Sequence, residues 1–336
     1  MPVQTHAIRI HEPGGADALQ WETVMLNDPG PGEVLLRQTA VGLNFIDVYH
    51  RSGLYPVETP FTLGMEGAGA VEAVGSGVTE FKPGDRVAYA DNPIGAYAEK
   101  RLMPADRCVP VPDGLSDELA AAVMLKGLTA HYLLRSTFRV EPGHTVLIHA
   151  AAGGVGLLAC QWAKSLGATV IGTVGSAEKA ELAQAHGCDH PINYREVDFV
   201  ERVAAITQGE KCDVVYDSIG ADTFMASLDC LKLRGTMVSY GQASGKVGAF
   251  DTGLLAVKGS LFLTRPILFH YMAKRADLLS AAAELFDLIE RGVLHVEINQ
   301  RWPLKDAAAA HRALEARQTT GSTVLLPEGG YSAAEL

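Results

Sequence analysis

The stretch Thr145-Val-Leu-Ile-His-Ala-Ala-Ala-Gly-Gly-Val-Gly156 joins a short apolar run to a turn whose residues carry almost no side chain. An apolar run of this length is typical of a buried parallel strand. After the turn, apolar residues recur with the period of one helix face, at Val155, Leu158, Ala159, Trp162, Ala163 and Leu166. Gly167 follows as a predicted C-terminal cap. The stretch therefore predicts a strand, a glycine turn and a helix in succession.

The glycine turn is the first candidate binding site. A turn of this kind leaves backbone N–H groups at a helix N-terminus, where a pyrophosphate can bind. The residues that we expect to contact it are Gly153, Gly154, Val155 and Gly156. The string reads AxxGxxG instead of GxGxxG, so its place between a strand and a helix carries the prediction. The alternative is a tight turn that needs small residues only for packing.

The segments that follow alternate between strand and helix. Strands are predicted at 168–174, 189–194, 212–217 and 236–240, and helices at 176–186, 198–208 and 222–231. Such alternation is typical of a doubly wound parallel sheet with helices on both faces. The predicted fold class is therefore α/β.

The flanks of this region have a different pattern. Up to about residue 126, short apolar runs are separated by Gly and Pro, which predicts a compact, irregular β domain. After residue 268, two predicted helices precede a final short strand. We therefore predict two domains, one formed by residues 1–126 with 269–336 and the other, at 127–268, inserted into it. Ligands favour domain interfaces, so the expected binding site is a cleft between the two domains.

The composition limits the possible partners. The formal net charge of −11 argues against nucleic acid or an anionic membrane as the main partner. The sequence contains no run of 18 apolar residues and no N-terminal secretion signal, so neither a membrane span nor secretion is expected. Five cysteines without CxxC spacing indicate reduced thiols in a cytoplasmic protein.

Four motifs in order carry a resemblance to a known family. They are Asn44-Phe-Ile-Asp-Val-Tyr-His-Arg-Ser-Gly-Leu-Tyr55, Gly64-Met-Glu-Gly-Ala-Gly69, Lys126-Gly-Leu-Thr-Ala-His-Tyr132 and Ala150-Ala-Ala-Gly-Gly-Val-Gly156. Together they resemble the NADPH:quinone oxidoreductases, the zeta-crystallin-like and zinc-independent branch of the medium-chain dehydrogenases/reductases. The similarity runs from about residue 5 to Pro327. It implies a GroES-like catalytic domain, a Rossmann domain and a cofactor in the cleft between them.

The sequence departs from the zinc-dependent relatives at their metal ligands. Their catalytic Cys falls here within Val41-Gly-Leu-Asn44, and their His is replaced by Met65. Zinc is bound by thiolate, imidazole or carboxylate, so neither replacement is a suitable ligand. The four clustered cysteines of a structural zinc lobe are also absent between Asp91 and Lys100. We therefore predict no metal site.

The end of the second predicted Rossmann strand favours NADPH over NADH. A site that prefers NAD places Asp or Glu there to bond the ribose 2′-hydroxyl. The sequence instead reads Val174-Gly-Ser-Ala-Glu-Lys179, in which Gly175 leaves room for a phosphate, Ser176 can donate and Lys179 adds charge. Glu178 is expected to face solvent, because adjacent side chains of a helix point apart. The alternative for Lys179 is an ordinary solvated lysine.

The resemblance nominates further residues for the cofactor and the substrate. For the nicotinamide end and the catalytic residues it implies Asn44, Asp47, Lys126 and Thr129, with Tyr49 and Tyr55 as an aromatic wall for a flat substrate. For the rest of the cofactor it implies Tyr132, Tyr194, Ser218, Tyr240, Gly241, Leu263, Thr264, Arg265 and Arg317. It also implies a homodimer, which the apolar run Ser260-Leu-Phe-Leu-Thr264 supports, because such a run at a sheet edge needs a cover.

Several of these residues have a structural alternative. Asp47 could be a local turn or cap residue, and Lys126 could extend its amine to solvent. Tyr49 and Tyr55 could be ordinary core residues, whereas Tyr194 and Arg317 could be plain surface residues. The sequence leaves these alternatives open.

The expected reaction is reduction of a quinone by NADPH without a metal. A quinone gains aromatic stabilisation on reduction and needs little polarisation, so hydrogen bonds from Asn44 or a tyrosine, with protons from water, would suffice. Two alternatives remain. One is an alkenal, enone or enoyl reductase on the same scaffold, and the other is an NADPH-binding structural or sensing protein with little turnover.

Overall fold

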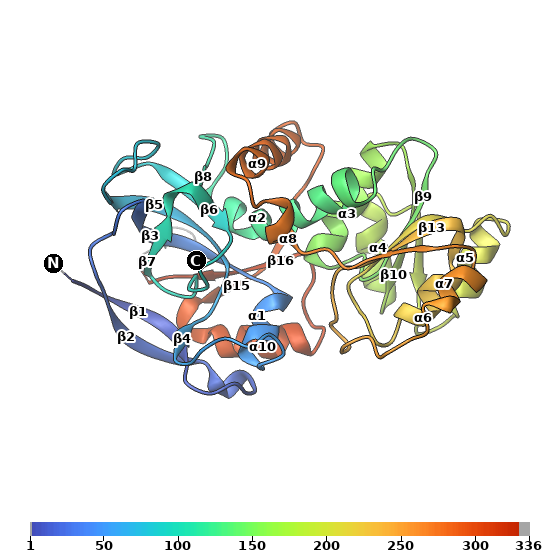
Figure 1. Ribbon diagram of the computed structural model, residues 1–336, viewed down its shortest axis with the longest axis horizontal. Helices are drawn as coiled ribbons and strands as arrows, with labels where there is room; N and C mark the ends of the chain where they lie inside the picture. The colour runs from blue at the N-terminus through green and yellow to red at the C-terminus, as the bar shows by residue number, and fades with distance from the viewer. Residues whose placement is uncertain (1, 329–336) are drawn as a thin grey trace. The chain divides into compact units, whose positions relative to one another are not determined.

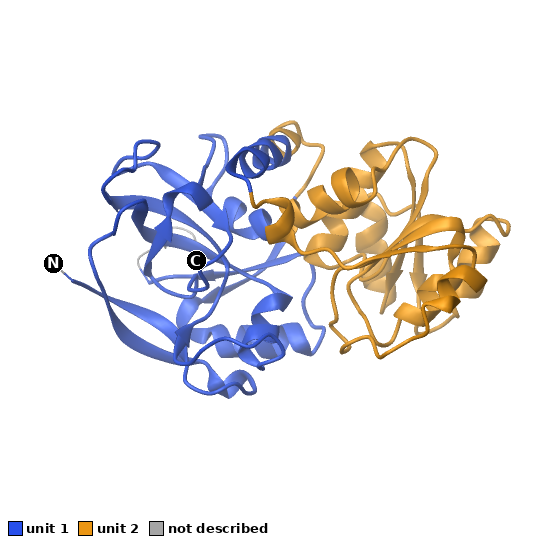
Figure 2. Cartoon of the chain, in the orientation of Figure 1, with its two compact units in different colours: residues 1–125, 274–286, 296–336 blue, residues 126–273, 287–295 orange. Residues whose placement is uncertain are grey.

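The structure, a computed structural model, describes residues 2–328 and contains two compact units (Figures 1 and 2). Unit 1 comprises the chain up to Leu125, the segment Lys274–Phe286 and the chain from Val296 onward. Unit 2 comprises Lys126–Ala273 and Asp287–His295. The predicted domain ranges, 1–126 with 269–336 and 127–268, stay a prediction.

Unit 2 is built on a six-stranded sheet in which every neighbouring pair is parallel. Its strands are β9 (Thr145–Ile148), β10 (Thr169–Val174), β11 (His190–Asn193), β12 (Cys212–Asp217), β13 (Leu231–Ser239) and β14 (Phe262–Thr264). They lie in the order β11-β10-β9-β12-β13-β14, which is the doubly wound order of a Rossmann fold. The predicted α/β fold class is confirmed.

All but the last of the helices of unit 2 connect these strands, and the last, α8 (Leu268–Tyr271), follows β14 (Figure 1). The others are α3 (Gly154–Ser165), α4 (Ala177–Ala185), α5 (Phe199–Ile206), α6 (Phe224–Asp229) and α7 (Gly253–Val257). Helix α3 packs against α4, and α5 packs against α6. Because helices cover the sheet, the central strands are nearly continuous apolar runs, with Leu147, Ile171 and Val215 fully buried.

The main difference from the sequence prediction in unit 2 concerns β13. The strand was expected to begin at residue 236, but it begins at Leu231, where Leu231 pairs with Cys212. Its first half contains Lys232 and Arg234, and Leu233 is exposed. The charged residues do not resemble a strand when the sequence is considered locally. The strand forms there because Leu231 pairs with Cys212, and the preference of a residue for a strand depends on its neighbours in the sheet.

Unit 1 contains two sheets. The smaller one has the order β2-β1-β4, formed by β1 (Val3–Ile10), β2 (Gln20–Leu26) and β4 (Phe61–Thr62). The larger one has the order β15-β16-β3-β5-β6-β8, with β7 paired to β3. Its strands are β3 (Glu33–Leu43), β5 (Glu66–Val74), β6 (Arg86–Ala90), β7 (Lys100–Pro104), β8 (Val109–Pro110), β15 (Ile298–Pro303) and β16 (Ser322–Leu326). Strand β16 pairs antiparallel with β3, so the end of the chain completes a sheet that its beginning started.

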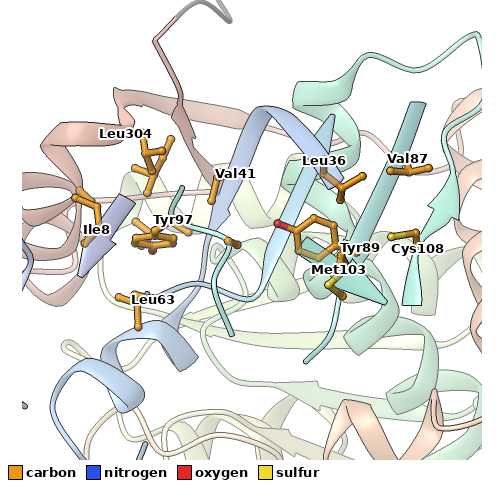
Figure 3. Packing of buried hydrophobic residues seen from close by; sticks show 14 of the residues in the cluster. Ile8, Leu36, Val41, Leu63, Val87, Tyr89, Tyr97, Met103, Cys108 and Leu304 are labelled. Carbon is orange, nitrogen blue, oxygen red and sulfur yellow. The ribbon is translucent and has the colours of Figure 1, made fainter. Parts of the chain in front are cut away.

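The core of unit 1 lies between these strands (Figure 3). It includes Ile8, Leu36, Leu63 and two fully buried tyrosines, Tyr89 and Tyr97. The helices are α1 (Phe45–Arg51), α2 (Asp117–Tyr132), α9 (Arg275–Glu290) and α10 (Ala307–Glu315), and boundaries to unit 2 fall within α2 and within α9. Helix α2 continues into a π-helical turn at Leu133–Thr137.

Among the described residues, no helix combines the length and the apolar character needed to cross a membrane.

Candidate functional site

Most of the candidate cofactor residues follow the carboxyl end of a strand of unit 2. The strands are all parallel, so these ends share one edge of the sheet, where ligands of such folds bind. Gly153 follows β9, Gly175 follows β10, Tyr194 follows β11, Ser218 follows β12, Tyr240 and Gly241 follow β13, and Arg265 follows β14. Residues chosen from separate segments are therefore brought to one edge.

The glycine turn lies between β9 and α3, with Gly153 as the N-cap of α3. Ala150 has a positive φ of 53°, so the chain turns sharply here. Any Cβ at Gly156 would collide with the carbonyl oxygen of Ala150, because α3 packs directly on the end of the strand. The first N–H groups of α3 have no acceptor within the helix and are available to an anion.

The end of β10 has the polar groups expected for a phosphate. Ser176 is the N-cap of α4, and its Oγ accepts the backbone N–H of Lys179 at 3.3 Å. A Cβ at Gly175 would lie 3.0 Å from the hydroxyl of Tyr194 and 3.6 Å from Nε of Arg195. Sequence reasoning missed Arg195, although a cation directly after Tyr194 was a visible signal.

Glu178 differs from its expected role in one respect. It is exposed, but its carboxylate forms a hydrogen bond with Ser176, which lowers the pKa of Glu178. The carboxylate therefore lies beside the hydroxyl that was expected to receive a phosphate. A bound phosphate would have to displace this acid, because like charges repel.

The remaining candidates of unit 2 gather near the ends of β12 and β13. The carbonyl of Asp217 accepts the N–H of Tyr240 at 2.8 Å, and a Cβ at Gly241 would lie 2.5 Å from the carbonyl oxygen of Ser218. Tyr132 is buried and stacks on Tyr271, with ring centroids 4.6 Å apart. Burial raises the pKa of Tyr132, with Tyr240 as a further cause, so its hydroxyl stays protonated.

Leu263 and Thr264 belong to β14, in which Thr264 pairs with Val238 of β13. Nη1 of Arg265 donates to the carbonyl of Pro266 at 3.3 Å. These three residues therefore extend the same edge of the sheet on its β14 side.

Asn44 and Asp47 meet at the start of α1 in unit 1. Asn44 is the N-cap of this helix, and Oδ2 of Asp47 accepts its backbone N–H at 2.9 Å. Asp47 thus has the capping contact that the sequence left open as an alternative. The side chain of Asn44 is held separately, because its Nδ2 donates to Oε2 of Glu66 at 2.6 Å.

Glu66 is a residue of this site that sequence reasoning missed. It is fully buried at the start of β5, and its Oε1 accepts the N–H of Leu125 within α2 at 2.6 Å. A Cβ at Gly42 would collide with its carboxylate, so the neighbouring strand leaves it space. The sequence signal for Glu66 was its place directly before the small residues Gly67-Ala-Gly69. A buried carboxylate there needs hydrogen-bond donors.

Tyr49 and Tyr55 lie in one aromatic cluster with Phe45 and His50. The rings of Tyr49 and Tyr55 are 5.1 Å apart in an edge-to-face arrangement, and His50 lies 5.8 Å from Tyr55. Tyr49 is buried and Tyr55 is half-buried. Burial lowers the pKa of His50 to about 4, so the imidazole is neutral at pH 7.

Lys126, Thr129 and Arg317 have distinct surroundings. Lys126 and Thr129 are both buried in α2, and Lys126 is only 5 % exposed, which argues against an amine extended to solvent. Arg317 follows α10 in the left-handed conformation, with φ of 60°, and its N–H bonds to the carbonyl of Leu314 at 3.0 Å. Contact of any of these residues with a ligand stays a prediction.

Within residues 2–328, no three His, Cys, Asp or Glu side chains lie close enough together to hold a metal ion. Met65, at the position of the zinc-binding histidine of the relatives, is buried in the core.

The two units define a class of protein. Residues 30–113 match the alcohol dehydrogenase GroES-like domain, and residues 154–277 match the zinc-binding dehydrogenase family. The chain thus combines the two domains of the medium-chain dehydrogenases/reductases.

Comparison with individual proteins narrows this class. The chain is 56% identical over 315 residues to a quinone oxidoreductase of Pseudomonas aeruginosa, covering 94% of this chain and 97% of that protein. It is 51% identical to a 2-haloacrylate reductase of a Burkholderia species, covering 95% and 98% of the two chains. The solved structure of Escherichia coli quinone oxidoreductase complexed with NADPH is 51% identical, with a TM-score of 0.95, covering 96% of this chain and 100% of that one. The chain belongs to the quinone oxidoreductase family, so the resemblance seen in its motifs is confirmed.

Proposed function

We propose that the protein is an oxidoreductase that reduces quinones with NADPH and without a metal. The main support is the Rossmann sheet with a glycine turn at the N-terminus of α3, in a chain 51% identical to a quinone oxidoreductase whose structure holds NADPH. The assignment of quinones as substrates is based on the family alone. The assignment of NADPH as cofactor is based on the family and also on residues of unit 2.

The residues present fit NADPH. The N–H groups of Gly154, Val155 and Gly156 in the first turn of α3 would bind the pyrophosphate. No acid follows β10 directly, and Ser176, Lys179 and Arg195 supply donors for a 2′-phosphate once the phosphate has displaced the exposed Glu178 carboxylate from Ser176. Tyr194 is 41% exposed beside Gly175, and its ring would contact the adenosine.

NADPH, when bound, supplies a hydride, and Asn44, Tyr49 and Tyr55 are the residues proposed to orient the reacting groups. One N–H of the Asn44 amide is held by Glu66, so the amide has a fixed plane. Asn44 would then orient the carboxamide or the accepting oxygen, while Tyr49 and Tyr55 would form an apolar wall for a flat acceptor. Water would supply the protons that the reduced acceptor takes up.

A second candidate function is reduction of conjugated carbonyl compounds. It is favoured by the 51% identity to a protein named 2-haloacrylate reductase, because a haloacrylate also has a double bond conjugated to a carbonyl group. Such a substrate takes hydride at the β-carbon and passes negative charge to oxygen, where Asn44 could donate a hydrogen bond.

The test is steady-state oxidation of NADPH with 1,4-quinones, enals, 2-haloacrylate and simple ketones, with and without a chelator. We expect turnover with quinones, none with unactivated ketones, and no loss on chelation. A preference for cyclohexanone over 1,4-benzoquinone would contradict the proposal. Tight NADPH binding without turnover on any acceptor would favour a binding or sensing role.

We also propose a homodimer and a cytoplasmic location. Strand β14 is the edge of its sheet, and Phe262 on it is 61% exposed, which favours a covering partner strand. All five cysteines are buried and free, as expected in a reducing compartment. Light scattering should give twice the chain mass for the wild type and a smaller mass for Phe262→Lys, and a monomeric wild type would exclude the dimer.

A further inference from the structure

A chain of buried hydrogen bonds links the C-terminal helix α10 to Asp47. Nη1 of Arg51 lies 3.1 Å from Nδ1 of His311. Nε2 of the same imidazole lies 3.0 Å from the hydroxyl of Tyr97, and that hydroxyl lies 3.0 Å from Oδ2 of Asp47. His311, Tyr97 and Asp47 are fully buried. All four residues belong to unit 1, and the series of hydrogen bonds ends at the Asp47 carboxylate, which accepts the backbone N–H of Asn44.

The chemistry of the groups determines which group donates and which accepts in each of these hydrogen bonds. A guanidinium can only donate, so His311 accepts at Nδ1 and carries its proton on Nε2. Burial, with the nearby charge of Arg51, lowers the pKa of His311 to about 3, so the ring is neutral. The Nε2–H therefore donates to the Tyr97 oxygen. Burial and Asp47 raise the pKa of Tyr97, so its O–H is retained and donates to the carboxylate.

Both ends of the chain are anchored. At the outer end, Nη1 and Nη2 of Arg51 donate to the two carboxylate oxygens of Glu315 at 2.8 and 2.7 Å. Glu315 lies one turn after His311 on α10, so this ion pair fixes the helix that carries the imidazole. At the inner end, Oδ2 of Asp47 accepts hydrogen bonds from both the Tyr97 hydroxyl and the backbone N–H of Asn44. The carboxylate is thus held by a group outside α1.

We propose that Tyr97 and His311 are positioning residues that set the place of Asn44 through Asp47. Helix α1 has seven residues, so its first turn depends on contacts from outside the helix. Glu66 fixes the Asn44 side chain and Asp47 fixes its backbone, and Tyr97 fixes Asp47 in turn. The proposal rests on the proposed function, because it assigns these residues to the orientation of the reacting groups by Asn44.

The protein contains a matched control for Tyr97 in Tyr89. Tyr97 and Tyr89 are both fully buried tyrosines of the same core, and Figure 3 shows them in different parts of it. The Tyr89 hydroxyl donates to Oε1 of Gln38, not to Asp47. Gln38 in turn donates to the carbonyls of Ala96 and Ala98, so Tyr89 reaches the backbone around Tyr97 but not Asp47 itself. Removal of either hydroxyl leaves a buried defect, but only the Tyr97 hydroxyl donates directly to the carboxylate that accepts the N–H of Asn44. A purely structural role would make the two variants alike.

The experiment measures kcat, KM for a quinone and Kd for NADPH in Tyr97→Phe, Tyr89→Phe, His311→Leu and His311→Gln. We expect kcat to fall about tenfold or more in Tyr97→Phe and His311→Leu, with KM and Kd changed less than about threefold, because small displacements of reacting groups reduce rate. Tyr89→Phe should keep its kcat. His311→Gln should recover most of the rate, because its amide can accept from Arg51 and donate to Tyr97.

A double mutant separates positioning from general damage. If Tyr97 acts through Asn44, Tyr97→Phe combined with Asn44→Ala should be no slower than Asn44→Ala alone, to within about twofold. Additive losses, or equal losses in Tyr97→Phe and Tyr89→Phe, would overturn the assignment. If Tyr97→Phe does not fold, equal rates in His311→Leu and His311→Gln would overturn it. A wild type that reduces no quinone would instead refute the proposed function, and the assignment with it.

Discussion

Lys179 and Arg195 place two cations near the end of β10, where no acid directly follows the strand. We expect Lys179→Ala to weaken NADPH binding about ten- to a hundredfold and to leave NADH nearly unchanged, because a charge-assisted contact contributes about 1.5–3 kcal/mol. Arg195→Ala should act in the same direction. Fluorescence titration with both cofactors measures the effect, with Lys164→Ala on α3 as the control. Equal losses for NADPH and NADH would remove the 2′-phosphate assignment.

Asn44 is held by two carboxylates, Glu66 on its side chain and Asp47 on its backbone. If it orients the reacting groups, Asn44→Ala should lower kcat by up to about a hundredfold, because a misplacement of about 1 Å has that effect. The Kd for NADPH should change much less. Stopped-flow and steady-state rates with one quinone decide this, and an unchanged kcat would exclude Asn44 from the site.

The close packing of helix α3 on the end of strand β9 should contribute to the stability of the protein. In Gly156→Ala the new Cβ would collide with the backbone carbonyl of Ala150, so the helix must move away from the strand. In Gly153→Ala the nearest atom, the same oxygen, would lie 3.2 Å away, and φ is −82°. We expect thermal unfolding to show a loss of about 2 kcal/mol or more for Gly156→Ala, and clearly less for Gly153→Ala.

Element boundaries show what local sequence can predict. The start of α3 and five of the six parallel strands follow from apolar runs and turn residues, and the sixth, β14, lies within the apolar run that was expected at a sheet edge. The start of β13 was misplaced, because pairing of Leu231 with Cys212 overrides the charged residues that follow. The candidate residues at the carboxyl edge could be nominated from sequence, since a parallel sheet brings all such ends together.

The stability of the whole molecule should fall in mild acid. The pKa values of His50 and His311 are lowered to about 4 and about 3, both below the ordinary 6.5. Below pH 6.5 the unfolded chain therefore binds protons that the folded chain does not. The free energy of unfolding should decrease by about 1.4 kcal/mol per pH unit for each histidine as pH falls from about 6 toward 4.

Urea unfolding at a series of pH values checks this prediction. His311→Gln should reduce the pH slope, whatever its effect on stability at pH 7. The same substitution at the exposed His270 serves as the control and should keep the wild-type slope. A slope that His311→Gln leaves unchanged would contradict the buried, neutral state of His311.

The sequence by itself determined the alternating strands and helices of the Rossmann unit and its glycine turn, because period and residue size act over a few neighbouring positions. The family came from the resemblance of four motifs in order. The sequence offered Asp47 as a possible cap beside Asn44, but it did not indicate how the Asn44 side chain is held or that Tyr97 and His311 lie behind Asp47. The contact of Asn44 with Glu66 spans 22 residues, and the contact between Tyr97 and His311 spans 214. Such contacts exist only once β5 lies beside β3 and the C-terminal segment has closed the sheet by pairing β16 with β3. Strand register and packing decide these distances, and neither is encoded in any short stretch of residues.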